Sequence, residues 1–519
     1  MAGVVDNGAN TIFLGGGGPA YGSPQSLLLK YANRHGLIAG ATGTGKTVTL
    51  QTLAESLSLA GVPVFLADVK GDLAGLSQPG GAEGPLHKPF SERAGQIGLS
   101  LDYQAFPVTF WDVWGQKGHP VRTTPAEMGP LLLSRLLDLT DAQEGVMNIA
   151  FRVADEEGLA LLDLKDLQAM LVWVGQNAAD LSLRYGNVSA ASVGAIQRAL
   201  LVLENQGGDS LFGEPALELS DIIRQDASGR GMINILAADK LMQSPRLYAT
   251  FLLWLLSELF EQLPEVGDPD RPRVAFFFDE AHLLFDGAPK ALVEKVEQVA
   301  RLIRSKGVSL WFISQNPADI PEGVLGQLGN RIQHALRAFT AKDQKALRMA
   351  ADNYRANPDF DTAEAIQHVG TGEAVTSLLE AKGVPGMVQR TLIRPPFSLI
   401  GPASDAERAQ VMNASPMALK YGRSMDRESA HELLSRRAEE AAKATARAKD
   451  TDDLFDMTRD EYRNARRYQP RDEARPERGR SSRSDTMVEA FGKSLARQLG
   501  TKSGQAIVRG VLGSLFRGR

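Results

Sequence analysis

The chain has 519 residues, of which 43% are hydrophobic, and its formal net charge at pH 7 is −5. A chain of this length is expected to form two or more domains around a large core. The small net charge excludes a protein whose whole surface attracts nucleic acid, so any such contact must be local. The sequence contains no cysteine, which excludes disulfide bonds and thiolate metal sites.

Two further features favour a cytoplasmic location. Residues 1–10 lack the charged start and apolar run of a signal peptide. The best apolar run, at residues 247–256, is too short to cross a bilayer and indicates a core helix. We therefore expect a cytoplasmic protein without a transmembrane segment.

The stretch at residues 36–57 carries the strongest functional motif. Residues 36–39 predict a buried strand, residues 40–47 fit the phosphate-binding pattern G-x-x-x-x-G-K-[ST], and residues 48–57 predict the following helix. Glycines allow successive backbone N–H groups to approach a triphosphate, and the helix N-terminus adds its positive dipole end. Lys46 is expected to reach the β- and γ-phosphates, and Thr47 to offer its hydroxyl to Mg²⁺. The predicted ATP-binding residues are Gly40, Ala41, Thr42, Gly43, Thr44, Gly45, Lys46, Thr47 and Val48.

A later apolar stretch, residues 274–278, ends directly in Asp279 and Glu280. This pattern predicts a buried strand that delivers two carboxylates to the edge of the sheet where α/β proteins bind ligands. Asp279 is expected to hold the Mg²⁺ shell, and Glu280 to orient and polarise the attacking water. An acidic strand end alone often caps a helix. Together with the phosphate loop, however, the pair indicates an enzyme that hydrolyses a nucleoside triphosphate.

Two other predicted strands end in polar residues at the same edge. Residues 308–314 precede Gln315, whose amide either senses hydrolysis at the γ-phosphate or caps the strand. Residues 62–68 end in Asp68, with Asp72 shortly after. These two carboxylates either help to place water or metal, or close a turn. The sequence leaves both pairs of alternatives open.

The remaining segments predict a helical insertion and a separate C-terminal region. Residues 125–205 show leucine stripes at helical spacing and lie between strands predicted at 106–111 and 231–238. The glycine run at 15–18 predicts a turn, and residues 80–104 predict a loop. Residues 428–449 predict an exposed helix and residues 451–486 a weakly ordered charged linker. Residues 487–516 predict a basic helix for a membrane surface, nucleic acid or, preferably, a neighbouring domain or subunit.

Taken in chain order, these motifs and the run from Ser314 through Pro317 resemble the HerA/FtsK superfamily, and more narrowly the bacterial HerA C-terminal-domain-like ATPases of YjgR type. The resemblance covers about residues 10–400 and the basic tail. It implies a RecA-like P-loop core of mostly parallel sheet flanked by helices, with an all-helical insertion and a helical, partly disordered tail. The expected division is 1–110 and 229–402 for the two parts of the core, 111–228 for the insertion and 403–519 for the tail.

The resemblance also implies an assembly and a set of catalytic positions. The family forms rings, commonly hexamers, with ATP at the subunit interfaces. The residues that match its catalytic positions are Lys46, Thr47, Asp279, Glu280 and Gln315. An arginine of the adjacent subunit would stabilise charge on the transferred phosphoryl group, with Arg331 as the first candidate and Arg304 as the second.

Two functions follow from this resemblance. The first is a ring motor that moves on DNA, for which Lys240 and the loop around Lys88 are weak candidate contacts. The second is an ATPase that acts on protein or at a membrane surface, with the basic terminal helix as its anchor. The stretch before Gly40 is too short for the N-terminal β-barrel of archaeal HerA. The resemblance therefore leaves DNA engagement and a nuclease partner open.

Overall fold

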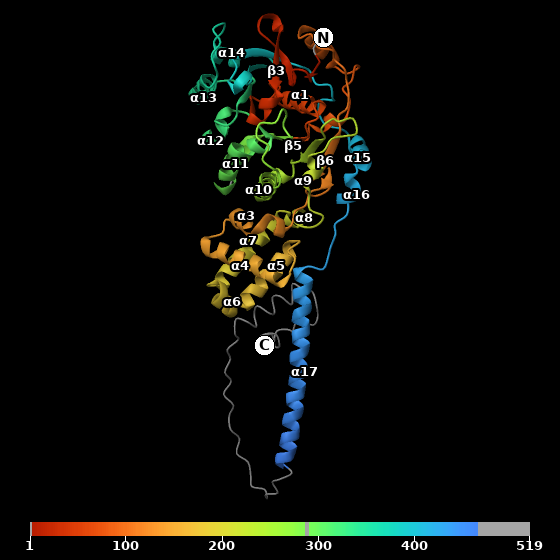
Figure 1. The fold of residues 1–519 in the computed structure, drawn as a ribbon, viewed down its shortest axis with the longest axis vertical. Coiled ribbons are helices and arrows are strands. Elements are labelled where there is room, and N and C mark those ends of the chain that lie inside the picture. The colour runs from red at the N-terminus through yellow and green to blue at the C-terminus, as the bar shows by residue number, and fades with distance from the viewer. Residues whose placement is uncertain (1–2, 286–289, 465–519) are drawn as a thin grey trace.

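The computed structural model describes residues 3–285 and 290–464 (Figure 1). Within them, thirteen strands form one sheet in the order β1-β2-β13-β12-β11-β4-β10-β9-β5-β8-β6-β7, with β3 paired to β2 outside this path. The strands from β11 to β7 are parallel, whereas β12, β13, β1, β2 and β3 pair antiparallel. The predicted α/β core with a mostly parallel central sheet is confirmed.

The strands are β1 Val5–Asp6, β2 Thr11–Gly17, β3 Ser23–Leu28, β4 Gly36–Ala39, β5 Val64–Asp68, β6 Val108–Asp112, β7 His119–Pro120, β8 Ile233–Ala237, β9 Val274–Phe278, β10 Val308–Ser314, β11 Asn330–Gln333, β12 Glu373–Ser377 and β13 Gln389–Ile393.

The helices are α1 Lys46–Leu59, α2 His87–Gln96, α3 Pro125–Leu136, α4 Asp141–Glu157, α5 Leu164–Gln176, α6 Ala178–Tyr185, α7 Ala190–Asn205, α8 Gly208–Leu211, α9 Leu219–Ile222, α10 Pro245–Gln262, α11 Lys290–Leu302, α12 Glu322–Leu325, α13 Ala341–Asp352, α14 Thr362–His368, α15 Asp405–Ala414, α16 Met417–Tyr421 and α17 Ala430–Asn464.

Helices cover both faces of the central sheet, and β9 shows how the sequence produces this arrangement. Successive side chains of a strand point to opposite faces. Phe277 therefore belongs to the apolar cluster that contains α1, and its ring stacks on Trp311 at 5.8 Å between centroids. Phe276 belongs to the cluster on the other face, which contains α10, together with Phe65. A strand that is apolar on both faces is thus buried on both, as expected for a parallel sheet.

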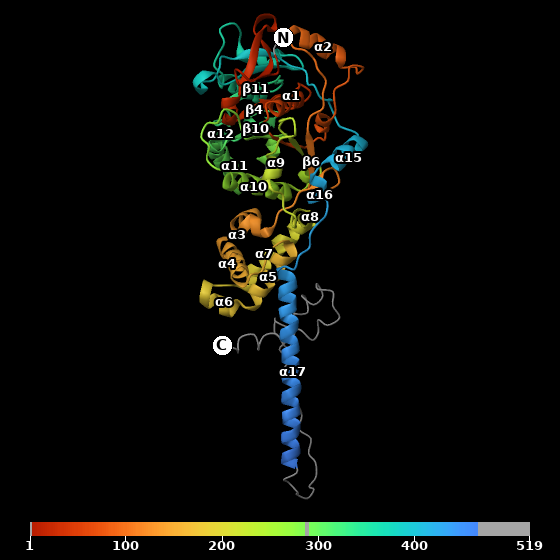
Figure 2. The same cartoon turned by 45° about the vertical axis from the view of Figure 1, so that its right-hand side comes forward.

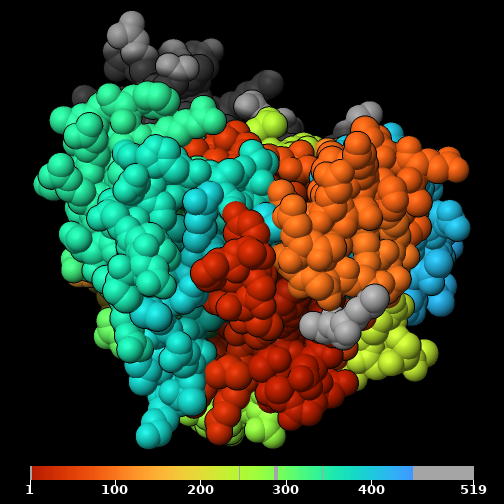
Figure 3. Space-filling view, turned by 90° about the horizontal axis from the view of Figure 1, so that it is seen from above, coloured from red at the N-terminus to blue at the C-terminus, as the bar shows by residue number. Residues whose placement is uncertain are grey.

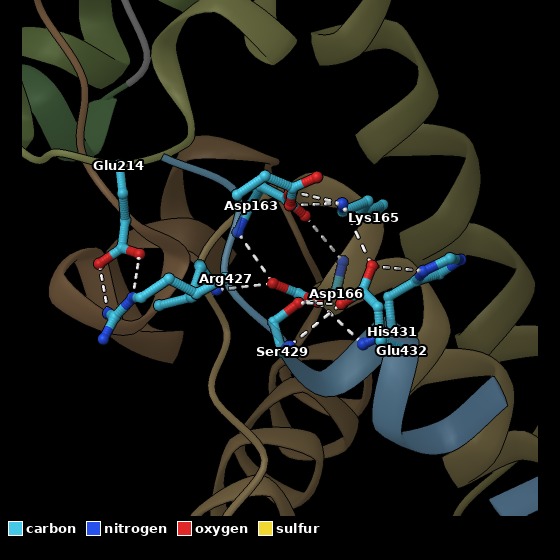
Figure 4. A network of polar contacts seen from close by, with 10 residues as sticks. Asp163, Lys165, Asp166, Glu214, Arg427, Ser429, His431 and Glu432 are labelled. Carbon is cyan, nitrogen blue, oxygen red and sulfur yellow. Dashed lines mark hydrogen bonds and ion pairs between the residues drawn. The ribbon is translucent and has the colours of Figure 1, made fainter. Parts of the chain in front are cut away.

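The helices α3 to α7 of the helical insertion lie at one end of the core, and α17 extends away from it (Figures 1 and 2). A polar network joins the start of α17 to α5 (Figure 4). Asp166 is buried and accepts hydrogen bonds from the Ser429 hydroxyl at 2.6 Å and from the His431 backbone N–H at 2.9 Å. Lys165 lies 3.3 Å from Glu432. These contacts fix the beginning of α17 on the insertion.

Three segments differ from the sequence prediction. Gly15 and Gly16 continue β2 instead of forming a turn. The missing side chain of Gly15 allows the close pairing with the neighbouring strand, because a Cβ there would lie 2.1 Å from the Leu392 carbonyl oxygen. The predicted loop at 80–104 contains α2, and α17 continues past residue 451 to Asn464.

Viewed from the end opposite α17, the N-terminal segment lies between the orange and the blue-green segments (Figure 3). The basic helix predicted at 487–516 lies outside the described residues.

Among the helices that the structure describes, no single one is both long and apolar enough to cross a bilayer. The helices α6 and α7, which are bent by 100° relative to each other, are long and apolar enough for this only when they are taken together.

Candidate nucleotide-binding and hydrolysis site

The order of the strands brings the predicted site residues to one edge of the sheet. β10 lies between β4 and β9 and runs parallel to both, with Ser314 opposite Ala39 and Phe312 opposite Phe278. The residues that follow these strands are the phosphate loop, Gln315 and the pair formed by Asp279 and Glu280. Because the carboxyl ends of parallel strands meet at one edge, these groups share a crevice.

The phosphate loop has the backbone geometry that a triphosphate requires. Gly40, Gly43 and Gly45 have φ angles of +152°, +78° and +115°, which L side chains rarely adopt. A Cβ on Gly43 would meet no other atom within 4 Å, so this part of the loop faces open space. A backbone hydrogen bond attaches the loop to the segment after β11: the Ala41 N–H donates to the Ala335 carbonyl oxygen at 2.8 Å. The loop therefore has the glycine-dependent backbone and the open side that are expected of a phosphate-binding loop.

Lys46 begins α1 and is buried, with 7% of its surface exposed. Its ammonium group donates to the carbonyl oxygens of Gly40 at 2.6 Å and Ala41 at 3.2 Å. Burial lowers the pKa of Lys46, and the nearby carboxylates of Glu280 and Asp279 oppose this effect. The lysine of the loop is thus within electrostatic reach of the acidic pair, although the two lie far apart in the chain.

Asp279 is buried and carries one free acceptor. Its Oδ1 accepts the Glu280 backbone N–H at 2.9 Å, whereas its Oδ2 is buried without a hydrogen-bond partner. Burial raises the pKa of Asp279 to about 7, and the neighbouring Glu280 adds to this shift. A buried carboxylate with a spare oxygen fits a hard cation.

The first turn of α1 supplies a second oxygen for such a cation, the hydroxyl of Thr47. Within residues 3–285 and 290–464, no group of three or more His, Asp or Glu side chains is arranged to hold a metal ion. Mg²⁺ is usually held by one or two protein oxygens, substrate phosphates and water. The donor set therefore fits Mg²⁺ that arrives with a nucleotide.

The backbone of Glu280 has a left-handed conformation, with φ +47° and ψ +47°. Its side chain lies close to three other side chains. Its Oε1 forms an ion pair with Lys70. Its Oε2 lies 3.4 Å from Gln315 Nε2 and 3.4 Å from His282 Nδ1. Burial raises the pKa of Glu280, but Lys70, Gln315 and His282 together outweigh burial, and the pKa lies below its usual value. Glu280 is consequently ionised and able to accept a proton.

The turn after β5 gives separate roles to its two aspartates. Asp68 accepts the backbone N–H groups of Gly71 at 2.8 Å and Leu73 at 3.1 Å, and so closes the turn. Asp72 instead has a buried Oδ1 without a hydrogen-bond partner. Sequence reasoning overlooked Lys70, which this turn presents to Glu280. Its position between the two aspartates, just after a strand of the sheet, was the available signal.

Both candidate arginines make contacts within their own chain. Arg331 donates to the carbonyl oxygens of Leu325, Leu328 and Asn353 at 3.2–3.3 Å. Arg304 pairs with Asp268 at 2.9 Å and precedes β10, so it lies at the opposite edge of the sheet from the phosphate loop. A role for either arginine at a neighbouring subunit's nucleotide would require these contacts to be exchanged.

Most of the chain matches one protein family. Residues 17–519 match the family described as "Helicase HerA-like C-terminal". The chain belongs to this family. It is a P-loop ATPase of the HerA-like family, as the motifs around Lys46 and Asp279 predict.

Individual relatives of this HerA-like chain are distant. The chain is 32% identical over 98 residues to the "DNA double-strand break repair helicase HerA" of Sulfolobus acidocaldarius and spans only 19% of that protein's length. Among solved structures, the conjugative coupling protein TrwB is 14% identical, with 77% of this chain and 92% of that chain covered and a TM-score of 0.47. VirB4 of Thermoanaerobacter pseudethanolicus is 17% identical, with 78% and 99% covered and a TM-score of 0.47.

Proposed function

We propose that this HerA-like ATPase is a motor that couples ATP hydrolysis to translocation on DNA or to its remodelling. The observation that carries the proposal is the meeting of Lys46, Asp279, Glu280 and Gln315 in one crevice, because binding alone would not require a carboxylate aimed at water. The family description and the name of the Sulfolobus relative support DNA as the polymer.

The chemistry assigned to the crevice is phosphoryl transfer to water. The water oxygen bonds to the γ-phosphorus, and the bond from phosphorus to the β–γ bridging oxygen breaks, which gives ADP and phosphate. Glu280 accepts the proton of the water and passes it to the departing phosphate. Lys46 and the N–H groups of the loop stabilise the charge on the phosphate oxygens. Mg²⁺, held by Thr47 and Asp279, would supply further neutralisation of that charge.

We further propose that the chain works as a homo-oligomeric ring, with six subunits as the expected number. In such a ring ATP lies at the subunit interface, and an arginine from the neighbour completes the site. Arg331, on β11, remains the first candidate for this role. Arg304 remains the second.

The decisive experiment measures phosphate release from Mg-ATP without polymer and with single-stranded DNA, double-stranded DNA or anionic liposomes, alongside the particle mass with nucleotide bound. The proposal predicts that DNA raises the rate several-fold, that this stimulation declines steeply with salt, and that the particle is a multimer. Stimulation by liposomes and not by DNA would instead favour an ATPase acting at a membrane surface. The Lys46→Ala chain is the control for contaminating activity.

A further inference from the structure

The orientation of the Glu280 side chain depends on one strong contact. Its Oε1 pairs with the Lys70 ammonium group, whereas both contacts to its Oε2, from Gln315 and His282, are 3.4 Å long. The backbone of Glu280 has a φ of +47°, a conformation that is costly for a residue with a side chain. The lysine is therefore the main restraint on where this carboxylate points.

Lys70 is presented by a turn whose conformation is fixed. β5 is paired with β9 so that Ala67 lies opposite Phe278, and the turn after β5 thus sits beside the acidic pair. Asp68 accepts the N–H groups of Gly71 and Leu73, and Gly71 has a φ of +77°. These hydrogen bonds within the turn fix its conformation. The Lys70 side chain is 43% exposed, whereas the Glu280 side chain is only 7% exposed. A partly exposed lysine thus reaches in to a buried carboxylate.

Electrostatics explain why such a lysine is needed. Glu280 directly follows Asp279, which is buried, and Asp72 is close enough to interact with both Lys70 and Glu280. A bound triphosphate brings further negative charge to the same crevice. Like charges repel strongly where water is excluded, so Glu280 would turn away from the phosphates unless a cation offset the repulsion. Lys46 cannot do so alone, because its ammonium group lies in the phosphate loop and is assigned to the phosphate oxygens.

We propose that Lys70 is the positioning residue of Glu280: its ammonium group holds Oε1 so that the carboxylate stays directed at the attacking water while the triphosphate is bound. This inference rests on the proposed ATP hydrolysis. Lys70 acts through Glu280 and not on the phosphates. Its removal therefore lowers kcat while the KM for ATP and the affinity for nucleotide stay the same.

The experiment compares Lys70→Met, Lys70→Arg, Glu280→Gln and the double variant Lys70→Met/Glu280→Gln. Single-turnover release of labelled phosphate gives the rates, and a non-hydrolysable ATP analogue gives nucleotide affinity. We expect Lys70→Met to lose about 10- to 100-fold in kcat, a share of the factor that a positioned base supplies. Lys70→Arg should retain most of the rate, and in the double variant the lysine substitution should cause no further loss.

Lys117→Met is the matched control. Lys117 also pairs with a carboxylate, Asp239, and 51% of its side chain is exposed, but it lies on the loop between β6 and β7. We expect this variant to hydrolyse ATP at the wild-type rate. Thermal unfolding of Lys70→Met should match the wild type, which separates positioning from folding.

The outcomes separate this inference from the proposed function. A wild-type chain that hydrolyses no ATP overturns the proposed function itself. A wild-type chain that hydrolyses ATP, together with a Lys70→Met rate that is equal or higher, overturns only the role of Lys70. A further loss in the double variant, or weaker binding of the analogue to Lys70→Met, would show that Lys70 acts on the phosphates, and this result also overturns the inference.

Discussion

Arg394 and Glu55 form an ion pair that is completely buried, although the two residues lie 339 positions apart in the chain. The guanidinium Nη1 donates to Glu55 Oε2 at 2.9 Å, and Nη2 donates to the Thr52 carbonyl oxygen at 2.6 Å. Glu55 also accepts the backbone N–H of Ser398 at 2.9 Å. The pair joins α1, the helix that begins in the phosphate loop, to the segment that follows the last strand.

Glu55→Gln should destabilise the chain by about 3–5 kcal/mol, because it leaves the Arg394 charge buried without its counter-charge. The free energy of unfolding, from urea denaturation followed by far-UV circular dichroism, measures the effect. Glu156→Gln, which breaks exposed ion pairs with Arg152 and Arg184, is the control and should change little. A loss below about 1 kcal/mol for Glu55→Gln would show that the pair is not important for stability.

Lys46→Ala should abolish tight binding of Mg-ATP, since the only lysine of the phosphate loop is removed. Equilibrium titration with a fluorescent ATP analogue measures the affinity. Lys240→Ala is a suitable comparison, because Lys240 lies over the Trp114 ring after β8 and should not affect nucleotide affinity. Wild-type affinity in Lys46→Ala would refute the assignment of the phosphate loop.

The role of Arg331 can be tested by mixing two inactive chains. In a ring, an interface that joins the intact Glu280 of an Arg331→Ala subunit to the intact Arg331 of a Glu280→Gln subunit has a complete site. Mixed rings should therefore recover part of the ATPase rate. The same mixture with Arg304→Ala tests the second candidate. No recovery at any ratio of the two chains would exclude Arg331 as the residue that acts in trans.

His35 predicts a pH dependence of stability. Its Nε2 lies 2.7 Å from the Ala300 carbonyl oxygen, and its Nδ1 accepts the Leu310 N–H at 3.0 Å, so only the neutral ring fits. Burial lowers the pKa of His35 from 6.5 to about 4. The unfolded chain thus binds the proton first, and stability is present above pH 6.5 and lost as the pH falls toward 4.

Between pH 7 and pH 5.5 this histidine should cost the wild type about 1 kcal/mol that a His35→Asn chain does not lose. Asparagine is the substitute because its amide can donate and accept hydrogen bonds but does not titrate between these pH values. Urea denaturation at the two pH values measures the difference, with the exposed His368→Asn as control. An equal loss in wild type and His35→Asn would show that the ring is not held neutral.

Local sequence patterns predicted the central strands and the residues of the crevice, because each strand there is apolar and each site residue directly follows a strand or a glycine loop. The partner of Glu280 was not predictable in this way. Lys70 reaches it through the pairing of β5 with β9, which no local pattern encodes. The extension of β2 through its glycines likewise depends on close contact with β13.

We propose that the crevice formed by the phosphate loop and the acidic pair hydrolyses ATP with Glu280 as the base. The rate of phosphate release from Mg-ATP by the Glu280→Gln chain, relative to the wild type, tests it most directly. We predict a rate lower by about 100-fold or more, because the amide cannot accept the proton of the attacking water. Release at the wild-type rate would contradict the assignment of Glu280 as the base.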